Sequence, residues 1–227
     1  MAHQSIFLAS NSPRRRELLE QIGVRFSVLK LSIPENRLEN ETPENYVKRM
    51  AIEKASAGIK VLQQRDLKSQ KNTLSDWQST KKHATIGIVI GSDTAVVCDG
   101  EILGKPESPE QAELMLERLS ASTHEVFTGV AVSKHTGTGT NEGCQVLSAV
   151  SRNLVTFRKI RAEEIKAYVA TNEGADKAGS YAIQGLAAIF IEQLQGSYSA
   201  VMGLPLFETA SLLEQSGIDV LPKISSI

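Results

Sequence analysis

The sequence has few of the residues that hold together disulfide-rich or zinc-bound domains. Its two cysteines, Cys98 and Cys144, lie far apart in the chain. Two cysteines at that separation argue against a disulfide framework and against a clustered zinc site. No apolar run approaches the length of a membrane span, and no basic, then apolar, leader opens the chain. We therefore expect a cytoplasmic protein with no membrane partner.

Aromatic residues are also few, and the net charge is close to zero. Aromatics make up 5% of the chain and the formal net charge is −1. Single-stranded nucleic acid is usually bound by aromatic platforms in a basic groove, so these values disfavour a small RNA-binding protein. If the protein binds phosphate, the cationic residues that do so must be gathered at one place.

What remains is an ordinary globular composition, with 41% hydrophobic and 22% charged residues. At 227 residues the chain is long enough for a substantial core. Predicted strands and helices interleave along it, which indicates an α/β fold with a mixed sheet. We predict a single domain over residues 1–227, with a polar, exposed insertion at 63–84.

The start of the chain carries the most informative pattern. Ile6–Ala9 predicts a buried strand, and Ser12 followed by Pro13 predicts a helix start, as N-cap and N1. Arginines at positions 14–16 then fill the first turn, although a helix N-terminus is already positive. An anion bound there would explain them. A solvated basic helix start is the alternative that this motif alone leaves open.

A second polar pattern interrupts an apolar run in the middle of the chain. Residues 85–90 and 95–98 predict two strands, separated by a turn at Gly91–Thr94. Asp93 would then lie at a strand end and face a cleft, where a carboxylate can bind a divalent cation or accept a proton from water. An aspartate that only forms the turn is the alternative.

The other expected elements follow from capping and periodicity. His124 and Phe127 are expected on the outer face of their strand, and no Ser-His-Asp or Cys-His spacing favours covalent catalysis. The expected elements are a strand at 26–31, a helix at 43–62, a hairpin turn at 99–100, a helix at 109–119, strands at 123–133 and 144–158 joined by a loop at 137–143, a helix at 161–171, a strand at 186–191 and a helix at 205–216.

Four polar residues of the loops and the second helix remain ambiguous by themselves. Lys54, Lys105 and Lys177 are of a type that more often faces solvent than a ligand. Gln184 differs, because it stands in a glycine-rich loop beside Gly185. Backbone can approach a ligand closely there, and an amide can both donate to and accept from a base edge.

Together these segments resemble the Maf family of nucleotide pyrophosphatases. The similarity is carried by Leu8–Arg15, Glu53–Ala55, Gly91–Thr94 with Leu103–Pro106, His124–Val130, and Asp176–Gly185, in family order across nearly the whole chain. The resemblance implies an elongated, two-lobe fold of the inosine-triphosphatase-like kind with a central cleft, expected to form a homodimer. It also implies hydrolysis of a nucleoside triphosphate to monophosphate and pyrophosphate, with Mg²⁺ or Mn²⁺.

The resemblance also implies a role for each matched residue. Asp93 corresponds to the proton acceptor, and Glu35 with Asp93 to the acidic residues at the metal. The phosphate-handling positions are Ser10, Arg14, Arg15, Lys54, Lys105 and Lys177, and the positions tied to base choice are Arg14, Thr94 and Gln184.

Base choice separates two branches of the family. Tyr181–Gly185 resembles the branch that hydrolyses dTTP and UTP, whereas the branch acting on 7-methyl-GTP usually has an acidic residue where Gln184 stands. A neutral amide suits the alternating acceptors and donor of thymine or uracil, and a carboxylate suits a cationic methylated guanine. A 7-methyl-GTP pyrophosphatase remains an alternative, as does a non-catalytic nucleotide-binding regulator of septum formation.

Overall fold

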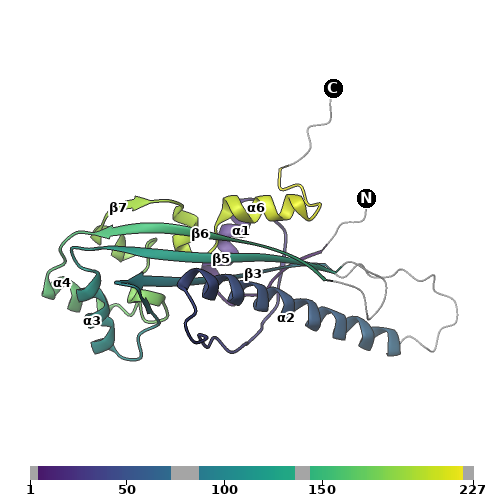
Figure 1. The fold of residues 1–227 in the computed structure, drawn as a ribbon, viewed down its shortest axis with the longest axis horizontal. Helices are drawn as coiled ribbons and strands as arrows, with labels where there is room; N and C mark the ends of the chain where they lie inside the picture. The colour runs from purple at the N-terminus through teal and green to yellow at the C-terminus, as the bar shows by residue number, and fades with distance from the viewer. Residues whose placement is uncertain (1–4, 73–86, 136–143, 222–227) are drawn as a thin grey trace, which may run out of the picture.

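The computed structural model describes residues 5–72, 87–135 and 144–221 as an elongated α/β molecule (Figure 1). Three long strands, β3, β5 and β6, run along its length, and helices cover the sheet at both ends. The elements are β1 (Ile6–Leu8), α1 (Pro13–Gln21), β2 (Ser27–Val28), α2 (Pro43–Asn72), β3 (Ile88–Cys98), β4 (Glu101–Leu103), α3 (Pro109–Leu119), β5 (Thr123–His135), β6 (Cys144–Phe157), α4 (Ala162–Ala170), η1 (Ala178–Ser180), η2 (Leu186–Phe190), β7 (Ile191–Gln195), α5 (Tyr198–Met202) and α6 (Leu206–Gln215).

Within the described residues, seven strands form one mixed sheet in the order β2-β1-β3-β5-β6-β7, with β4 paired to β3. Strand β1 is parallel to β2 and β3, and the other pairs are antiparallel. Leu8 is paired with Ile90. This parallel register brings the residues after β1 beside the centre of β3, so the arginine-rich start of α1 lies near Asp93.

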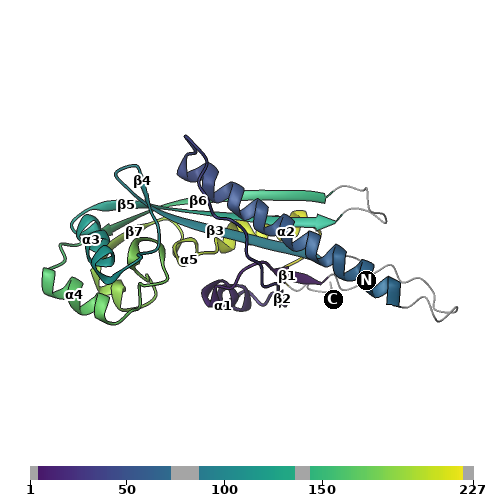
Figure 2. The same cartoon turned by 90° about the horizontal axis from the view of Figure 1, so that it is seen from below.

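Two hydrophobic cores divide the molecule into two lobes. One core packs α3 and α4 against the sheet and includes Leu116, Phe157 and Phe190. The other packs α1 and α6 against β1 and includes Leu19 and Leu213. Strands β3 and β5 contribute to both cores. Figure 2 shows α3 and α4 at one end of the molecule and α1 nearer its middle, close to β1 and β2. The expected two-lobe α/β fold is confirmed.

Helix α2 lies directly on the sheet because two glycines allow it to. A Cβ at Gly91 would lie 2.3 Å from the carbonyl oxygen of Ala51, and one at Gly129 would lie 2.3 Å from that of Val47. No side chain fits at such distances, so backbone meets backbone there. This close approach places Lys54 of α2 over β3.

Several expected elements are wrong in extent or type. Residues 63–72 of the expected insertion continue α2, because the polar residues there still have good helix propensity. Residues 73–84 and the loop at 137–143 lie outside the described residues. Residues 186–190 form a 3₁₀ helix instead of a strand, and α5 was not anticipated.

The expected turn at Gly91–Thr94 does not exist. Strand β3 runs unbroken from Ile88 to Cys98 and is paired with β5 throughout this segment. Gly91 serves helix packing, and the buried Ser92 hydroxyl donates to the carbonyls of Gly129 and Gly203 at 2.8 and 2.9 Å. Tertiary partners thus satisfy polar groups that in sequence indicate a turn.

His124 and Phe127 are buried, not exposed as expected. His124 packs edge-on against Phe157 and its Nε2 atom lies 2.9 Å from the Tyr181 hydroxyl. Phe127, on the opposite face of β5, packs in a cluster with Val47 of α2. Because both faces of this part of β5 are covered, alternation along the strand does not indicate exposure. None of the described helices is long and apolar enough to cross a membrane.

Candidate active site

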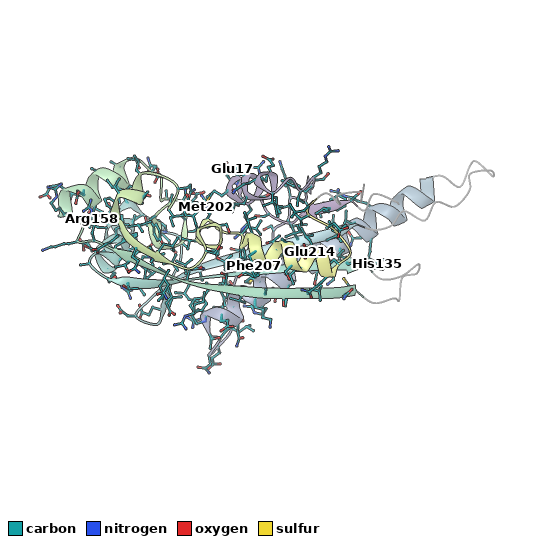
Figure 3. All side chains as sticks on the ribbon, turned by 90° about the horizontal axis from the view of Figure 1, so that it is seen from above. Glu17, His135, Arg158, Met202, Phe207 and Glu214 are labelled. Carbon is teal, nitrogen blue, oxygen red and sulfur yellow. The ribbon has the colours of Figure 1, made fainter. Side chains whose placement is uncertain are left out.

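A cleft of about 770 Å³ opens between the two lobes, and it gathers every residue to which the sequence assigned a role. Met202 of α5, also in its wall, lies between the lobe that carries Arg158 and helix α1, which carries Glu17 (Figure 3). The predicted residues that line the cleft are Ser10, Arg14, Arg15, Glu35, Lys54, Asp93, Thr94, Lys105, Lys177 and Gln184.

Charge in this cleft differs from that of the chain as a whole. Five cationic side chains and three acidic ones line it, although the chain has a net charge of −1. Local positive charge is what a polyphosphate needs. The cations are Arg14, Arg15, Lys54, Lys105 and Lys177, and the acids are Glu35, Asp93 and Asp176.

Lys54 joins two carboxylates at the centre of the cleft. Its ammonium donates to Oδ1 of Asp93 at 2.7 Å and lies 2.6 Å from Oε1 of Glu35. Helix α2 supplies Lys54, β3 supplies Asp93, and the loop before α2 supplies Glu35. Asp93 is 8% exposed, so its carboxylate is held in place by the sheet and by this ion pair.

The charges around this centre shift the pKa values of its neighbours. Burial acts to raise the pKa of Glu35, but the hydrogen bond from Lys54 and the charges of Lys54, Lys105 and Arg15 hold it below its usual value. Burial, together with the negative charges of Asp93 and Glu35, raises the pKa of Tyr46 to about 12. Both groups are therefore fixed in one protonation state at neutral pH.

Arg15 uses part of its guanidinium for hydrogen bonds within the protein. Its Nε donates to the carbonyl of Gly203 at 2.7 Å, and its terminal nitrogens donate to Ser10 at 3.1 Å and Thr94 at 3.4 Å. Burial lowers its pKa against the opposing effect of Asp93. Arg15 thus connects α1 to β3 and to the α5–α6 junction. It also lines the cleft, and two of its five N–H groups have no hydrogen bond to the described residues.

Arg14 and Lys105 are free to bind a ligand. In the part of the chain that the structure describes, neither side chain has a hydrogen bond or an ion pair. Two cations that line a cleft without partners are suited to an anionic ligand. Lys177, in contrast, pairs with Asp176 at 2.5 Å and donates to the carbonyl of Glu173.

Gln184 is the exposed residue at the tip of a buried loop. Tyr181, Ala182 and Ile183 before it are buried, and Gln184 itself is exposed in the cleft wall. Its amide has no hydrogen bond to any described residue. A free amide on a fixed backbone can bind the edge of a base through both donor and acceptor.

The loop that carries Glu35 is fastened to α2 by Arg49. The guanidinium donates to both oxygens of Glu41, at 2.7 and 2.8 Å, and to the carbonyl of Asn36 at 2.9 Å. The hydroxyl of Tyr46 donates to the carbonyl of Glu35 at 3.2 Å. These contacts fix the backbone at Glu35 and directly after it.

Sequence reasoning missed three residues of the site: Tyr46, Asp176 and Gly203. Asp176 directly precedes Lys177 in a matched segment, and that position could have indicated it. Tyr46 lies within the helix expected at 43–62, and nothing local in the sequence separates it from core residues. Gly203, with φ of 122°, contributes a carbonyl, which no side-chain pattern can reveal.

The donor set can be tested against Mg²⁺. No group of three or more His, Cys, Asp or Glu side chains clusters for a metal among the described residues. Mg²⁺, however, is usually held by one or two carboxylates together with substrate phosphates and water. Glu35 and Asp93, which already converge on one cation, fit that requirement.

Comparison of the sequence with known proteins identifies its family. The family model described as Maf-like protein matches residues 5–216. A relative from Alkalilimnicola ehrlichii is 46% identical over 94% of both chains, and one from Nitrosospira multiformis is 45% identical over 95% of this chain and 96% of its own. A relative from Aromatoleum aromaticum is 45% identical, over 93% of this chain and 95% of its own. All three are named dTTP/UTP pyrophosphatase, and this chain belongs to the Maf-like protein family.

Proposed function

We propose that this protein is a nucleoside triphosphate pyrophosphatase that hydrolyses dTTP and UTP to the monophosphate and pyrophosphate. The observation that carries the proposal is the convergence of Glu35 and Asp93 with the unpaired cations Arg14 and Lys105 in one cleft. The similarity of the chain to dTTP/UTP pyrophosphatases over nearly its full length supports the same reaction and the same substrates.

In the proposed reaction, Asp93 accepts a proton from a water molecule. The water oxygen bonds to the α-phosphorus, and the bond from that phosphorus to the α–β bridging oxygen breaks, so that pyrophosphate leaves with the electron pair. Arg14, Lys105 and the free N–H groups of Arg15 stabilise the charge that develops on the leaving group. Lys54 holds Asp93 and Glu35 in position until substrate arrives.

We propose that Glu35 and Asp93 would hold a divalent cation, Mg²⁺ or Mn²⁺. Such an ion, when bound, supplies charge neutralisation on the phosphate oxygens. Chelation with EDTA should abolish hydrolysis, and added Mg²⁺ or Mn²⁺ should restore it. Full activity in excess EDTA would contradict the metal requirement.

Gln184 is proposed to select the base, with Arg14 and Thr94. The free amide suits thymine and uracil because it matches adjacent acceptor and donor groups. A single methyl group changes binding by only about 1–3 kcal/mol in an apolar pocket, so we expect both dTTP and UTP to be accepted.

The test is phosphate release measured with malachite green across the common nucleoside triphosphates and 7-methyl-GTP. With added inorganic pyrophosphatase, dTTP and UTP should give the strongest signal; without it, no phosphate should appear. A signal without the added enzyme would mean cleavage at the γ-phosphate. A preference for 7-methyl-GTP or a purine would overturn the substrate assignment, and no release at all would favour a binding regulator.

Two further properties are part of the proposal. We infer a homodimer and a cytoplasmic location, as the family resemblance and the composition suggest. Light scattering on the purified protein tests the first and fractionation of cells tests the second. A monomer at micromolar concentration, or recovery outside the cytoplasm, would contradict the respective inference.

A further inference from the structure

We propose that Tyr168 and Glu173, which lie behind the cleft wall, are positioning residues that set base selectivity by fixing the backbone around Gln184. This inference rests on the proposed function. Neither residue lines the cleft, so neither touches substrate directly. Their effect passes through the loop Tyr181–Gly185.

Tyr168 of α4 bonds to the loop before Gln184. Its side chain is 4% exposed, and its hydroxyl accepts a hydrogen bond from the backbone N–H of Ala182 at 3.1 Å. The same hydroxyl donates to Oε1 of Glu173 at 3.0 Å. This hydroxyl therefore joins the backbone before Gln184 to the carboxylate of Glu173.

Glu173 bonds to the chain after Gln184. Its Oε2 accepts from the N–H of Leu186 at 3.0 Å, and its Oε1 accepts from that of Ala187 at 3.5 Å. The carboxylate fills the space beneath Gly185, where an added Cβ would lie 2.3 Å from Oε2. A side chain at position 185 would displace this carboxylate from its hydrogen bonds.

Tyr181, at the start of the loop, is held by a different set of contacts. The Tyr181 hydroxyl lies 2.9 Å from Nε2 of the buried His124, and both rings pack against Phe157. The segment is thus bonded at Tyr181, Ala182 and Leu186, while Gln184 between them has an unpaired amide. Tyr181 is held through its side chain and the other two through their backbone N–H groups, whereas the unpaired side chain of Gln184 lines the cleft.

This arrangement has a consequence for discrimination between bases. A free amide selects a base only if its oxygen and nitrogen stand at fixed positions. The triphosphate is bound elsewhere in the cleft, by Arg14 and Lys105. Loosening the loop should therefore weaken recognition of the base and leave binding of the polyphosphate unchanged.

The experiment measures dissociation constants by calorimetry for dTTP and for inorganic tripolyphosphate, in an Asp93→Asn background that prevents turnover. Tyr168→Phe and Glu173→Gln should each reduce the preference for dTTP over tripolyphosphate about fivefold to tenfold, the effect of losing one or two buried hydrogen bonds. Tripolyphosphate affinity should stay within about twofold. Ser120→Ala is the matched control, because it removes a hydroxyl that accepts from Ile160 in the same lobe but does not contact the loop.

Double variants test whether the effect passes through Gln184. In a Gln184→Ala background, Tyr168→Phe and Glu173→Gln should cause no further loss of preference, because coupled residues are not additive. Additive losses, or an equal fall in affinity for both ligands, would overturn the positioning role. So would a wild-type protein that binds dTTP no more tightly than tripolyphosphate.

Turnover of the same variants without Asp93→Asn separates this inference from the proposed function. If the wild type releases pyrophosphate from dTTP but the variants keep its base preference, only the positioning role fails. If no nucleotide is hydrolysed but the binding preference falls as expected, the positioning role stands and the proposed reaction fails.

Discussion

The ammonium of Lys54 is the shared counter-ion of the two carboxylates at the centre of the cleft. It lies within 2.7 Å of both Asp93 and Glu35, so two negative charges share one counter-ion. Removing either carboxylate leaves the other paired. A change at Asp93 therefore tests its chemistry more than the integrity of the site.

Asp93→Asn should lower kcat by at least about two orders of magnitude, because an amide cannot accept the proton from water. Affinity for dTTP should persist, since the loss of a negative charge does not weaken attraction for phosphate. Steady-state kinetics and calorimetry give the two values. Near-normal turnover would refute Asp93 as the base.

Lys105 and Arg15 should respond differently to truncation. Lys105→Ala removes an unpaired cation, so kcat/KM should fall by an amount that corresponds to about 1.5–3 kcal/mol of lost transition-state stabilisation. The melting temperature should not change, because Lys105 bonds to no described residue. Arg15→Ala should lower both, because Arg15 also bonds to Gly203, Ser10 and Thr94. Kinetics and calorimetric melting separate the cases, and equal stability of the two variants would contradict the structural role of Arg15.

His124 should make the protein less stable in mild acid. Burial lowers its pKa to about 4, from 6.5 in the unfolded chain. Between these values the unfolded state binds a proton that the folded state does not, so the free energy of unfolding falls as pH drops from 6.5 towards 4. The shift corresponds to about 3 kcal/mol.

Urea unfolding between pH 4.5 and 7.5 measures this effect. His124→Gln should be less stable at pH 7.5 but should show a much flatter dependence on pH, since glutamine does not titrate. A variant with the same slope as the wild type would show that other groups cause the acid sensitivity.

At the scale of elements, helix α2 positions most of the charged groups at the centre of the site. Gly91 and Gly129 let it approach the sheet, and this approach brings Lys54 to Asp93. The same helix carries Arg49, whose contacts with Glu41 and Asn36 hold the loop of Glu35. Two of the three groups at the centre thus depend on one helix.

Arg49→Lys should weaken metal binding about tenfold, as loss of a supporting hydrogen bond around a metal ligand commonly does. Lysine keeps the charge but cannot bond to both Glu41 oxygens and to Asn36 at once. Binding of Mn²⁺, followed by electron paramagnetic resonance without nucleotide, gives the value. Arg152→Lys, which alters an exposed pair with Glu125, is the control; identical Mn²⁺ affinity in both variants would refute the role of Arg49.

At the scale of the whole molecule, the cleft joins the two lobes. Ser10 and Arg15 come from the α1–α6 lobe, whereas Lys105 and Gln184 come from the α3–α4 lobe. A ligand that contacts both sides binds only the assembled molecule. Nucleotide binding should therefore stabilise the entire fold.

In the Asp93→Asn protein, dTTP at about one hundred times its dissociation constant should add about 2.7 kcal/mol to the free energy of unfolding. For a chain of this size that corresponds to a rise of about 5–10 °C in melting temperature. Scanning calorimetry measures the rise, which should shrink at the same dTTP concentration when Lys105→Ala is added. No rise at saturating dTTP would contradict a cleft that both lobes complete.

Helix starts and tight turns could be predicted from the sequence, because their signals lie in a few neighbouring residues. The Ser12–Pro13 and Ser108–Pro109 helix starts and the Asp99–Gly100 turn all occur where capping and turn chemistry predicted them. The family resemblance identified the residues that line the cleft, and their assigned roles remain predictions. A strand at 123–133 was predicted from its alternation, and β5 runs from Thr123 to His135.

Strand continuity, burial and hydrogen-bond partners could not be predicted where they depend on residues distant in the sequence. Gly91, Ser92 and Asp93 suggest a turn in sequence, yet they lie inside a strand because α2 approaches the glycine and remote carbonyls accept from the serine. His124 lies inside because the segment around Tyr181 covers it. Lys54 and Arg15 are bonded to the protein, whereas Arg14 and Lys105 are unpaired among the described residues. The tertiary structure decides this difference, because their hydrogen-bond partners are distant in the sequence.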